Sequence, residues 1–400
     1  MDATAPRAEQ VLADTGGAEP IRMQGVSKVY PDGTVGVQEL DLTFAAGELT
    51  VLVGPSGCGK TTTMKMINRI IEPSTGRILL GEDDVTRVDP NLLRRRIGYV
   101  IQNVGLFPHQ DVRANVGTVP RLLGWDKKRT RERVDELLAV VGLDPATFGR
   151  RYPHQLSGGQ RQRAGVARAL AADPTVLLMD EPFSAVDPVV RERLQTEFLR
   201  IQDTVRKTIV FVTHDIEEAV RLGDRIAVMS EGGKVEQFAS PAELLGRPAS
   251  PFVADFVGSD RGLKRLAVTG IDAADLEHPP VVRVDDDLAA ARAAMQGAGA
   301  RWAVVLGPDD ELHGWISQER AEGSGTVGAA GKRMEAWVPH DATLKTAFAQ
   351  MLQLEAGWVA VLDGSRFLGV LTPESLHAAL RRSVEGTAPE TAGAALTTVG

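Results

Sequence analysis

The chain has 400 residues, which is too long for a single ordinary core and predicts two or three domains. Hydrophobic residues make up 43% and charged residues 24% of the chain, as in folded globular proteins, and the formal charge is 45 − 53 = −8. A chain with this charge lacks the broad basic face of a nucleic-acid-binding protein, so no nucleic-acid partner is expected. The single cysteine, Cys58, excludes an internal disulfide and a cysteine-based zinc cluster.

The start of the chain carries no signal for secretion or membrane insertion. Residues 1–20 are rich in Ala, Gly, Asp and Glu without periodicity, and we expect them to be a disordered leader. No basic segment followed by an apolar run occurs near the N-terminus. No stretch approaches the roughly 18 to 20 apolar residues that cross a bilayer. We therefore expect a cytosolic chain that reaches a membrane only through a partner.

Short β-branched segments alternate with helical patterns through the first half of the chain. Two apolar segments within residues 21–44 flank a Pro-Asp-Gly turn at residues 31–33 and predict an antiparallel pair. Further along the chain, five short apolar runs predict buried strands at residues 49–53, 97–101, 176–179, 209–212 and 226–229. Between them lies a helical pattern with one apolar face, made of Val190, Leu194, Phe198, Ile201 and Val205. This alternation predicts an α/β domain with a mainly parallel sheet.

A glycine-rich segment between the strand at 49–53 and a helix predicted over residues 60–71 fits the pattern G-x-x-x-x-G-K-[ST]. This is the context of a Walker A loop, in which backbone N–H groups and the helix N-terminus surround a phosphate. Lys60 is expected to bridge the β- and γ-phosphates, and the Thr61 hydroxyl to coordinate Mg²⁺. Cys58 occupies an unconstrained position in the loop and is interpreted as filler. The loop residues predicted to bind ATP are Gly54, Pro55, Ser56, Gly57, Cys58, Gly59, Lys60, Thr61 and Thr62.

Two acids end the predicted strand at 176–179. Parallel strands present their C-terminal ends at the ligand crevice, so Asp180 and Glu181 are expected there. Asp180 suits the Mg²⁺ shell, and Glu181 suits polarisation of the attacking water. A strand that simply exits into solvent is the alternative, which the upstream Walker A loop disfavours.

A third motif, Leu156-Ser157-Gly158-Gly159-Gln160, stands at the start of a helix predicted to run to about residue 172. With this motif, the chain resembles the ATP-binding subunit of ABC transporters over roughly residues 21–240. The resemblance implies an α/β fold with a P-loop ABC-type nucleotide-binding domain at residues 21–258. It also implies a helical subdomain at about residues 103–165.

The resemblance implies roles for residues outside the Walker A loop. Gln102 corresponds to the Q-loop glutamine, which reaches Mg²⁺ and water and faces the permease. Ser184 and Asp187 fall in the D-loop, where Val186 replaces the usual leucine. His214 matches the switch histidine that contacts the γ-phosphate.

Tyr30 matches the aromatic residue that stacks on adenine in this family, although a half-buried strand tyrosine is the alternative interpretation. The backbone N–H groups of Ser157, Gly158 and Gly159 form an anion site far in sequence from the Walker A loop. In the resembled family this site binds the γ-phosphate held by the opposite subunit, so each ATP is shared across a two-fold interface.

The cofactors implied are therefore ATP and Mg²⁺, with the ion held by Thr61, Gln102 and Asp180. The partners implied are a second copy of the chain, integral membrane permease subunits and an extracytoplasmic solute-binding protein. The location implied is peripheral, on the cytoplasmic face of the bacterial plasma membrane.

The last third of the chain contains an internal repeat. A shift of 56 residues places Met295 on Met351 and Trp302 on Trp358, and each copy follows the order strand, helix, strand, turn, strand, helix. Self-similarity of this kind predicts two equivalent modules packed together. The expected boundaries are a linker at 259–280, modules at about 281–325 and 335–384 within an α/β unit at 281–384, and a disordered tail at 385–400.

These repeats resemble a CBS domain pair, and residues 97–109 look like the osmoprotectant branch of ABC importers, which handles glycine betaine, carnitine, choline and proline-like solutes. CBS pairs often bind adenosine compounds through an acid three residues after a Ser or Thr. Here Arg320 follows Ser317, and Ser375 follows Thr372, so that acid is absent from both copies. A small ligand, a packing role without ligand and inhibition relieved by intracellular salt all remain open.

Three other functions were weighed against a compatible-solute importer. A soluble ABC ATPase acting on DNA or ribosomes usually carries two cassettes or long coiled-coil insertions, and this chain has neither. An exporter commonly fuses its membrane spans to the cassette. An importer of another small solute, such as an amino acid or a metal chelate, is the main alternative, because the binding protein and the membrane channel choose the solute.

Overall fold

The computed structural model describes residues 17–101, 105–184 and 187–385, which form two compact units. Unit 1 contains the chain up to residue 244 together with residues 248–257. Unit 2 contains residues 245–247 and the chain from residue 258 onward. In the described residues, we find no helix with the length and apolar character needed to cross a membrane.

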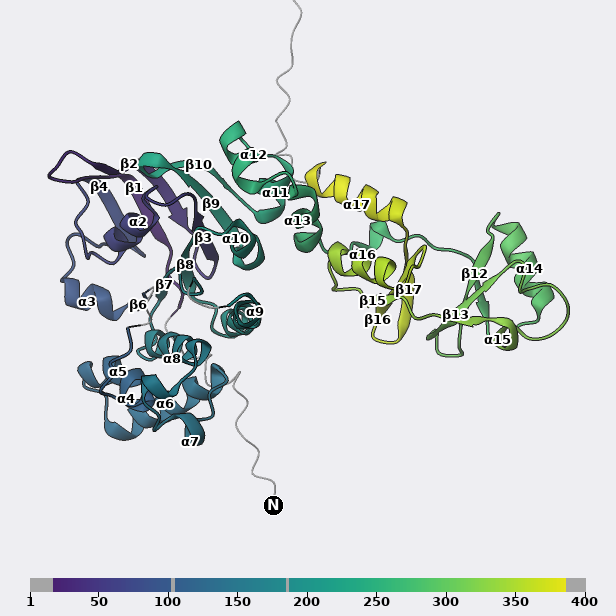
Figure 1. The fold of residues 1–400 in the computed structure, drawn as a ribbon, viewed down its shortest axis with the longest axis horizontal. Coiled ribbons are helices and arrows are strands. Elements are labelled where there is room, and N and C mark those ends of the chain that lie inside the picture. The colour runs from purple at the N-terminus through teal and green to yellow at the C-terminus, as the bar shows by residue number, and fades with distance from the viewer. Residues whose placement is uncertain (1–16, 102–104, 185–186, 386–400) are drawn as a thin grey trace, which may run out of the picture. The chain divides into compact units, whose positions relative to one another are not determined.

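Two sheets make up the upper lobe of unit 1 (Figure 1). The first is antiparallel, has the order β2-β1-β4-β5 and comprises β1 (Ile21–Val29), β2 (Val35–Phe44), β4 (Thr75–Leu80) and β5 (Asp83–Asp84). The second has the order β10-β9-β3-β8-β7-β6 and comprises β3 (Leu49–Val53), β6 (Ile97–Val100), β7 (Val176–Asp180), β8 (Thr208–Thr213), β9 (Arg225–Ser230) and β10 (Lys234–Ala239). Its strands are parallel except for β10. All residues of β3 and β8 are buried, as expected of strands covered on both faces.

One core cluster joins the two sheets of the upper lobe through α2 (Lys60–Ile67). Met64, Met66 and Ile67 of this helix are fully buried in that cluster. The helix ends four residues earlier than predicted, at the cap residue Asn68. The remaining helical segments of the upper lobe are α3 (Pro90–Arg95), α9 (Pro188–Val205), α10 (Ile216–Leu222), η2 (Glu231–Gly233), α11 (Pro241–Gly246) and α12 (Pro251–Val257).

A helical lobe lies below the sheets in Figure 1, where the helical subdomain was predicted. It comprises α4 (Val112–Val116), α5 (Thr118–Leu122), α6 (Lys127–Val140), α7 (Pro145–Phe148), η1 (Pro153–Gln155) and α8 (Gly158–Leu170). Aspartate side chains cap three of these helices, α4, α6 and α7, and Ser157 caps α8. Such caps satisfy the free N–H groups of the first turn, which fixes where each helix begins.

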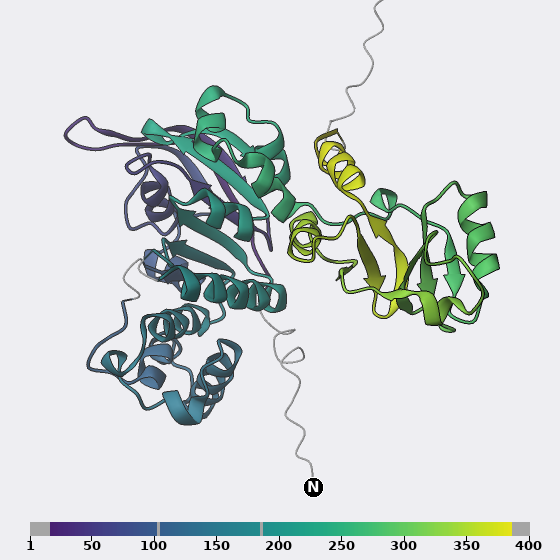
Figure 2. The same cartoon turned by 45° about the vertical axis from the view of Figure 1, so that its right-hand side comes forward.

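Unit 2 contains the two predicted repeats, each with its own sheet. The first comprises β11 (Val281–Arg283), α14 (Leu288–Gly297), β12 (Trp302–Leu306), β13 (Leu312–Ser317), α15 (Val327–Ala330) and β14 (Lys332–Arg333). The second comprises β15 (Trp337–Pro339), α16 (Leu344–Gln353), β16 (Val359–Asp363), β17 (Arg366–Leu371) and α17 (Pro373–Glu385). Figure 2 shows the two sheets side by side, with green α14 on one flank and yellow α16 and α17 on the other.

The segment expected as a linker, residues 259–280, is part of unit 2. It contains α13 (Arg261–Val268) and η3 (Ala273–Asp275). Leu266 of α13 is 6% exposed and belongs to the core of the second repeat, and Glu277 pairs with Val370 of β17. This helix has only eight residues, which is shorter than the window over which periodicity distinguishes a helix from a linker.

Two tryptophans at equivalent positions of the repeats meet between the two sheets of unit 2. The rings of Trp302 and Trp358 stack with centroids 4.3 Å apart and an interplanar angle of 9°. They lie against a small buried cluster that contains Val304 and Leu306 of the first repeat and Val370 of the second. The two repeats therefore contact each other through equivalent residues.

We expect Trp358→Ala to lower the free energy of unfolding of unit 2 by about 2–3 kcal/mol, because it removes a stacked, partly buried ring. Trp337→Ala is the matched control, since Trp337 is 47% exposed and its loss should cost less than about 1 kcal/mol. Urea unfolding of the full-length protein, followed by circular dichroism, measures both. Equal effects of the two substitutions would contradict a stabilising role for the stacked pair.

Candidate functional site

The strand order of the parallel sheet brings three predicted motifs to one edge. β3 and β7 both pair with β8, in registers that align Val53 with Thr213 and Asp180 with Val212. The segment after β3 is the Walker A loop, β7 ends at Asp180, and β8 is followed by His214. Because the strands are parallel, these segments lie at the same carboxyl edge, as expected of a ligand site.

Two glycines of the Walker A loop cannot be replaced without moving the backbone. Gly54 has φ 156° and a Cβ there would lie 2.1 Å from the carbonyl oxygen of Met229. Gly59 has φ 102°, and its Cβ would lie 2.5 Å from the carbonyl oxygen of Gly36. Only glycine fits at these two positions. Because it has no side chain, the backbone can curl tightly enough for its N–H groups to surround an anion.

Lys60 lies inside the curve of the loop and is only 6% exposed. Its ammonium donates to the carbonyl oxygens of Gly54 and Pro55 at 2.7 and 2.8 Å. Cys58 is 1% exposed and packs in the core cluster of the upper lobe, which agrees with a filling role. The loop thus holds one buried cation beside a helix N-terminus, a combination suited to a phosphate.

The two Mg²⁺ ligand candidates described by the structure are in direct contact. The Thr61 hydroxyl donates to the Asp180 carboxylate at 3.0 Å, across 119 residues of sequence. Burial raises the pKa of Asp180, the Thr61 hydrogen bond opposes this rise, and the neighbouring Glu181 adds to it. Paired hydroxyl and carboxylate oxygens are hard ligands, so this pair fits Mg²⁺.

Glu181 and His214 form a second pair at the same edge. The Glu181 carboxylate lies 3.2 Å from Nδ1 of His214, and the Glu181 N–H donates to the Val212 carbonyl at 3.0 Å. Glu181 has φ 44°, in the left-handed region that non-glycine residues rarely adopt. This strained turn separates the two acids, so that Asp180 faces Thr61 while Glu181 faces His214.

Tyr30 lies beside the Walker A helix, as a nucleotide-stacking residue would. Its hydroxyl is 3.3 Å from the Thr62 hydroxyl, and the Lys28 ammonium lies 5.5 Å from the ring centroid. A Cβ on Gly36 would come within 2.8 Å of the Tyr30 ring, so Gly36 leaves the space that the ring occupies. Gly36 was not predicted, because the contact joins residues from opposite sides of a turn.

The structure also places Tyr99 of β6 on the strand beside β7, which ends at Asp180, and the sequence did not predict this. Burial, followed by the negative charge of Asp180, raises the pKa of Tyr99 to about 12. Its strand pairs in parallel with β7, so Tyr99 aligns with Leu178. Only the pairing of these two strands reveals that a tyrosine accompanies the acid.

The predicted D-loop and Q-loop residues are described in part. The Ser184 hydroxyl donates to the Glu181 carbonyl at 3.0 Å, and Asp187 caps α9 by accepting from the Val190 N–H at 3.1 Å. Gln102 and Val186 lie outside the described residues. Ser184 therefore contacts the backbone of Glu181, and the D-loop assignment stays a prediction.

The motif Leu156–Gln160 lies in the helical lobe, away from α2 and the Walker A loop in Figure 1. Ser157 and Gln160 form a capping box, in which Gln160 N–H donates to the Ser157 hydroxyl at 3.3 Å and Ser157 N–H to the Gln160 side chain at 2.9 Å. Ser157 and Gly158 are exposed, and a Cβ on Gly158 would meet no atom within 4 Å. Within one chain, this helix start and the Walker A loop are two separate anion-suited sites.

Comparison with known proteins places this geometry in a family. The family model described as "ABC transporter" matches residues 37–184. The glycine betaine/carnitine/choline transport ATP-binding protein OpuCA of Bacillus subtilis is 42% identical over 363 residues, which cover 89% of this chain and 95% of that protein. The chain belongs to the ATP-binding subunits of ABC transporters. It is therefore an ATPase subunit of a transport system.

Other relatives and solved structures agree with this membership. The osmoprotectant import ATP-binding protein OsmV of Salmonella typhimurium is 45% identical over 82% of this chain and 86% of that protein. The structure of cbiO1 from Clostridium perfringens, part of the ABC transporter complex cbiONQ, is also similar. The match covers 57% of this chain and 91% of cbiO1, with 28% sequence identity and a TM-score of 0.53. A dimeric ATP-binding cassette, MJ0796 with ADP and Pi, is 30% identical and covers 55% of this chain and 98% of its own, with a TM-score of 0.50.

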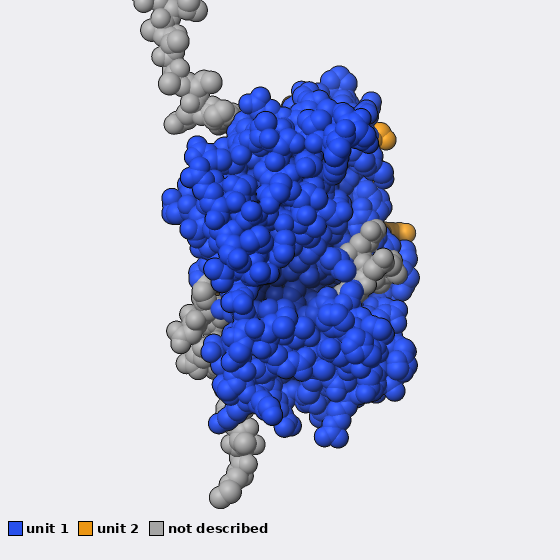
Figure 3. Space-filling view, turned by 90° about the vertical axis from the view of Figure 1, so that its left-hand side faces the viewer, with its two compact units in different colours: residues 1–244, 248–257 blue, residues 245–247, 258–400 orange. Residues whose placement is uncertain are grey.

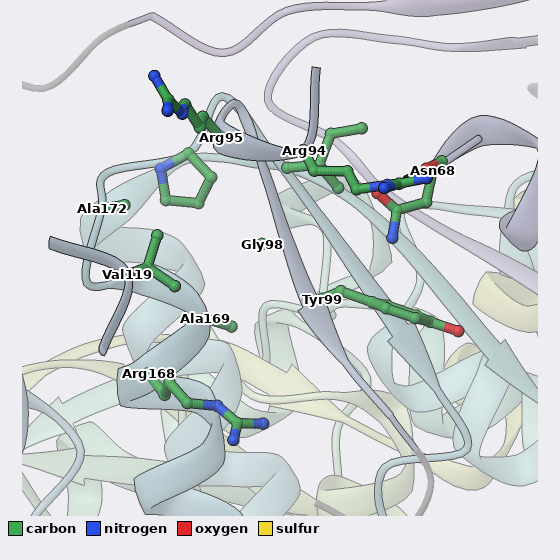
Figure 4. A pocket seen from close by; sticks show the side chains of 11 residues that line it. Asn68, Arg94, Arg95, Gly98, Tyr99, Val119, Arg168, Ala169 and Ala172 are labelled. Atoms are coloured by element: carbon green, nitrogen blue, oxygen red, sulfur yellow. Dashed lines mark hydrogen bonds between the residues drawn. The ribbon is translucent and has the colours of Figure 1, made fainter. Parts of the chain in front are cut away.

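A pocket of about 190 Å³ opens between the two lobes of this ABC ATPase subunit (Figure 4). Its lining includes Asn68, Arg94, Arg95 and Tyr99 from the upper lobe and Arg168 from the helical lobe. Figure 3 shows the hollow between the lobes on this face of unit 1. No Walker A residue lines the pocket, so it is distinct from the nucleotide site.

We expect Lys60→Ala to raise the Kd for ATP about 100-fold, because a charge-assisted contact with phosphate contributes up to about 3 kcal/mol. Lys128→Ala is the control, since Lys128 has an exposed side chain on α6. Titration with a fluorescent ATP analogue gives both Kd values, and thermal melting verifies that Lys60→Ala remains folded. A folded Lys60→Ala variant with wild-type affinity would contradict the assigned phosphate contact.

Proposed function

We propose that this subunit energises an importer of compatible solutes such as glycine betaine and related quaternary amines. The observation that supports this cargo is the extent of the match. Several relatives named for glycine betaine, carnitine, choline or osmoprotectant transport are 41–48% identical, and most of these match more than two thirds of this chain. Such matches include unit 2 as well as the cassette.

The cassette alone is a weaker guide to cargo. The spermidine/putrescine import ATP-binding protein PotA of Chromobacterium violaceum is 46% identical, but the match covers only 60% of this chain and 64% of that protein. A similar identity over the cassette therefore accompanies a different named cargo. Unit 2 is what favours compatible solutes over another small solute, such as an amino acid.

The proposed roles at the catalytic edge follow from its contacts. The Walker A loop and Lys60 bind the phosphates, and Tyr30 stacks on the base. Thr61 and Asp180, which share a hydrogen bond of 3.0 Å, hold Mg²⁺, and the ion neutralises phosphate charge when bound. Glu181 orients the attacking water and accepts its proton. His214, 3.2 Å from Glu181, contacts the γ-phosphate.

We further propose that two copies of the chain close around two nucleotides. The supporting observation is the exposed helix start at Ser157 and Gly158, apart from the chain's own Walker A loop, which is available to a nucleotide held by a second copy. Gln102, as the resemblance implies, would be a further ligand of the Mg²⁺ ion. The closed dimer binds membrane permease subunits at the cytoplasmic face of the plasma membrane. A solute-binding protein delivers the solute to those subunits.

We propose that unit 2 is a CBS pair that serves packing rather than adenosine binding. The Thr372 hydroxyl donates to the Glu277 carboxylate at 2.5 Å and accepts from the Ser375 N–H at 3.1 Å. In the first repeat, the Ser317 hydroxyl accepts from the Arg320 N–H at 3.3 Å. The hydroxyls that a ribose would approach thus have partners within the chain. The full-length Lys60→Ala variant, in which nucleotide binding by the Walker A loop is weakened, can be titrated with ATP, ADP and AMP. Binding at a second adenosine site would show that this proposal is wrong.

Two charge runs, Arg94-Arg95-Arg96 and Asp285-Asp286-Asp287, are the segments from which a response to intracellular salt was considered, and residues of both have local structural roles. Arg96 pairs with Glu19 at 2.7 Å and with Asp83 at 2.5 Å. Asp287 caps α14 by accepting from the Ala290 N–H at 2.7 Å. These contacts give no support to a salt sensor built from the two runs.

Glu181→Gln should bind ATP with an affinity close to that of the wild type and lower the rate of hydrolysis about 100-fold or more, because the amide cannot accept the proton of water. The variant should also persist as an ATP-bound dimer in size-exclusion chromatography. Glu192→Gln is the control, since Glu192 is an exposed carboxylate on α9 that pairs with Arg221. Near-normal turnover by Glu181→Gln would reject Glu181 as the catalytic carboxylate.

Deletion of the gene should abolish uptake of radiolabelled glycine betaine in cells under osmotic stress, and the wild-type gene should restore it. The gene carrying Glu181→Gln should restore expression of the protein but not uptake, because transport depends on hydrolysis. Uptake of a labelled amino acid and of putrescine in the same cells tests the alternative cargoes. Loss of one of those, with betaine uptake intact, would falsify the proposed cargo.

A further inference from the structure

Two polar side chains meet in the packed interior between α9 and α10. Gln195 of α9 is 5% exposed, and Glu218 of α10 is 7% exposed. The Gln195 amide donates a hydrogen bond of 3.0 Å to the Glu218 carboxylate. A buried carboxylate is costly unless hydrogen bonds satisfy it, so the loss of either partner disturbs the other.

Glu218 also contacts the end of β8. The Thr213 hydroxyl lies near enough to the Glu218 carboxylate to lower the pKa of that group. Burial raises the pKa of Glu218, and the negative charge of Asp215 adds to the rise, whereas Thr213, Gln195 and the positive charge of Arg191 oppose it. The carboxylate therefore joins three elements: β8, α10 and α9.

His214 lies between two residues that this network holds. Thr213 precedes it, and Asp215 follows it. The Thr213 hydroxyl accepts from the Asp215 N–H at 3.0 Å, and Asp215 caps α10 by accepting from the N–H groups of Glu217 and Glu218 at 2.8 and 3.3 Å. The backbone on both sides of the histidine is thereby fixed.

The same helix that carries Gln195 begins at the D-loop. Asp187 caps the first turn of α9, and Gln195 follows about two turns later on the same rigid element. Arg191, one turn before Gln195, lies 3.8 Å from the Asp215 carboxylate. A displacement of Asp187 would thus be passed along α9 to Arg191 and Gln195, and from them to Asp215 and Glu218.

We propose that Gln195 and Glu218 are positioning residues that hold His214 against Glu181 and couple it to the D-loop. This inference rests on the proposed function, in which His214 and Glu181 take part in ATP hydrolysis. Gln195 and Glu218 do not touch these two side chains. They act through Thr213, through the start of α10 and through α9.

Gln195→Leu removes the hydrogen-bond donor while keeping a side chain of similar size. We expect it to lower kcat for ATP about tenfold and to leave KM within about twofold, because a misplaced catalytic group costs turnover rather than binding. Gln202→Leu is the matched control, since Gln202 lies on the same helix, is 8% exposed and donates to the Lys207 carbonyl at 2.8 Å. The control should be destabilised to a similar extent, with kcat changed by less than about twofold.

A reciprocal exchange tests the same link without an apolar replacement. Gln195→Glu places two carboxylates together and should lower kcat at least as much as Gln195→Leu. Adding Glu218→Gln restores one donor and one acceptor and should bring kcat back to within about threefold of the wild type. This exchange decides the matter if Gln195→Leu folds poorly, and thermal melting of every variant reports folding.

Equal losses of kcat in Gln195→Leu and Gln202→Leu, or a double variant no more active than Gln195→Glu, would overturn the inference. The outcome is separable from failure of the proposed function. If wild type and Glu181→Gln hydrolyse ATP equally, the proposed catalytic site is wrong. If Glu181→Gln is inactive and Gln195→Leu retains wild-type kcat, only the positioning role is wrong.

Discussion

The adjacency of β3, β8 and β7 in one parallel sheet is the constraint on which the site depends. Because these strands run in the same direction, the segments that follow them emerge at a single edge. The Walker A loop, the acids at 180–181 and His214 are separated by more than 100 residues of sequence at their extremes, yet no long-range loop is needed to bring them together. The hydrogen bond between Thr61 and Asp180 is the direct consequence of this strand order.

The two units differ in how their sheets are packed. Unit 1 buries polar side chains in both lobes, among them Lys60 and Thr213 beside the parallel sheet and Asn115 and Gln162 in the helical lobe. Unit 2 pairs two small sheets of four and three strands, each with its own core cluster. The stacked Trp302 and Trp358 rings occupy equivalent positions in the two repeats. Together with the buried cluster beside them, they hold the two sheets against each other.

Sequence patterns predicted the elements whose signals are local. The β-branched runs gave β3, β7, β8 and β9 to within about one residue at each end, and the glycine–lysine spacing located the phosphate loop. The apolar face of α9 was correct at Leu194, Phe198 and Ile201, but Val190 is 39% exposed. Periodicity also gave no reason to expect buried Gln195 and Gln202 on that helix, because their partners come from elsewhere in the chain.

Contacts between distant residues were harder to predict for the same reason. Tyr99 beside Asp180, Gly36 beside Tyr30 and α13 in place of a linker all depend on which elements become neighbours. A motif states which residue type is needed, whereas a tertiary contact depends on strand order and register. The sequence therefore located the motifs of the candidate site but not the tertiary contacts around them.

The left-handed backbone of Glu181 has a consequence for any effort to make this protein more heat-resistant. A side chain at φ 44° carries a conformational penalty of about 1–3 kcal/mol, which glycine or asparagine would largely relieve. Selection for robustness alone would therefore favour losing the carboxylate at the very position where it faces His214. A substitution of Glu181 that raised thermal stability would therefore remove the carboxylate proposed for ATP hydrolysis. Stabilising substitutions are better sought elsewhere in the chain.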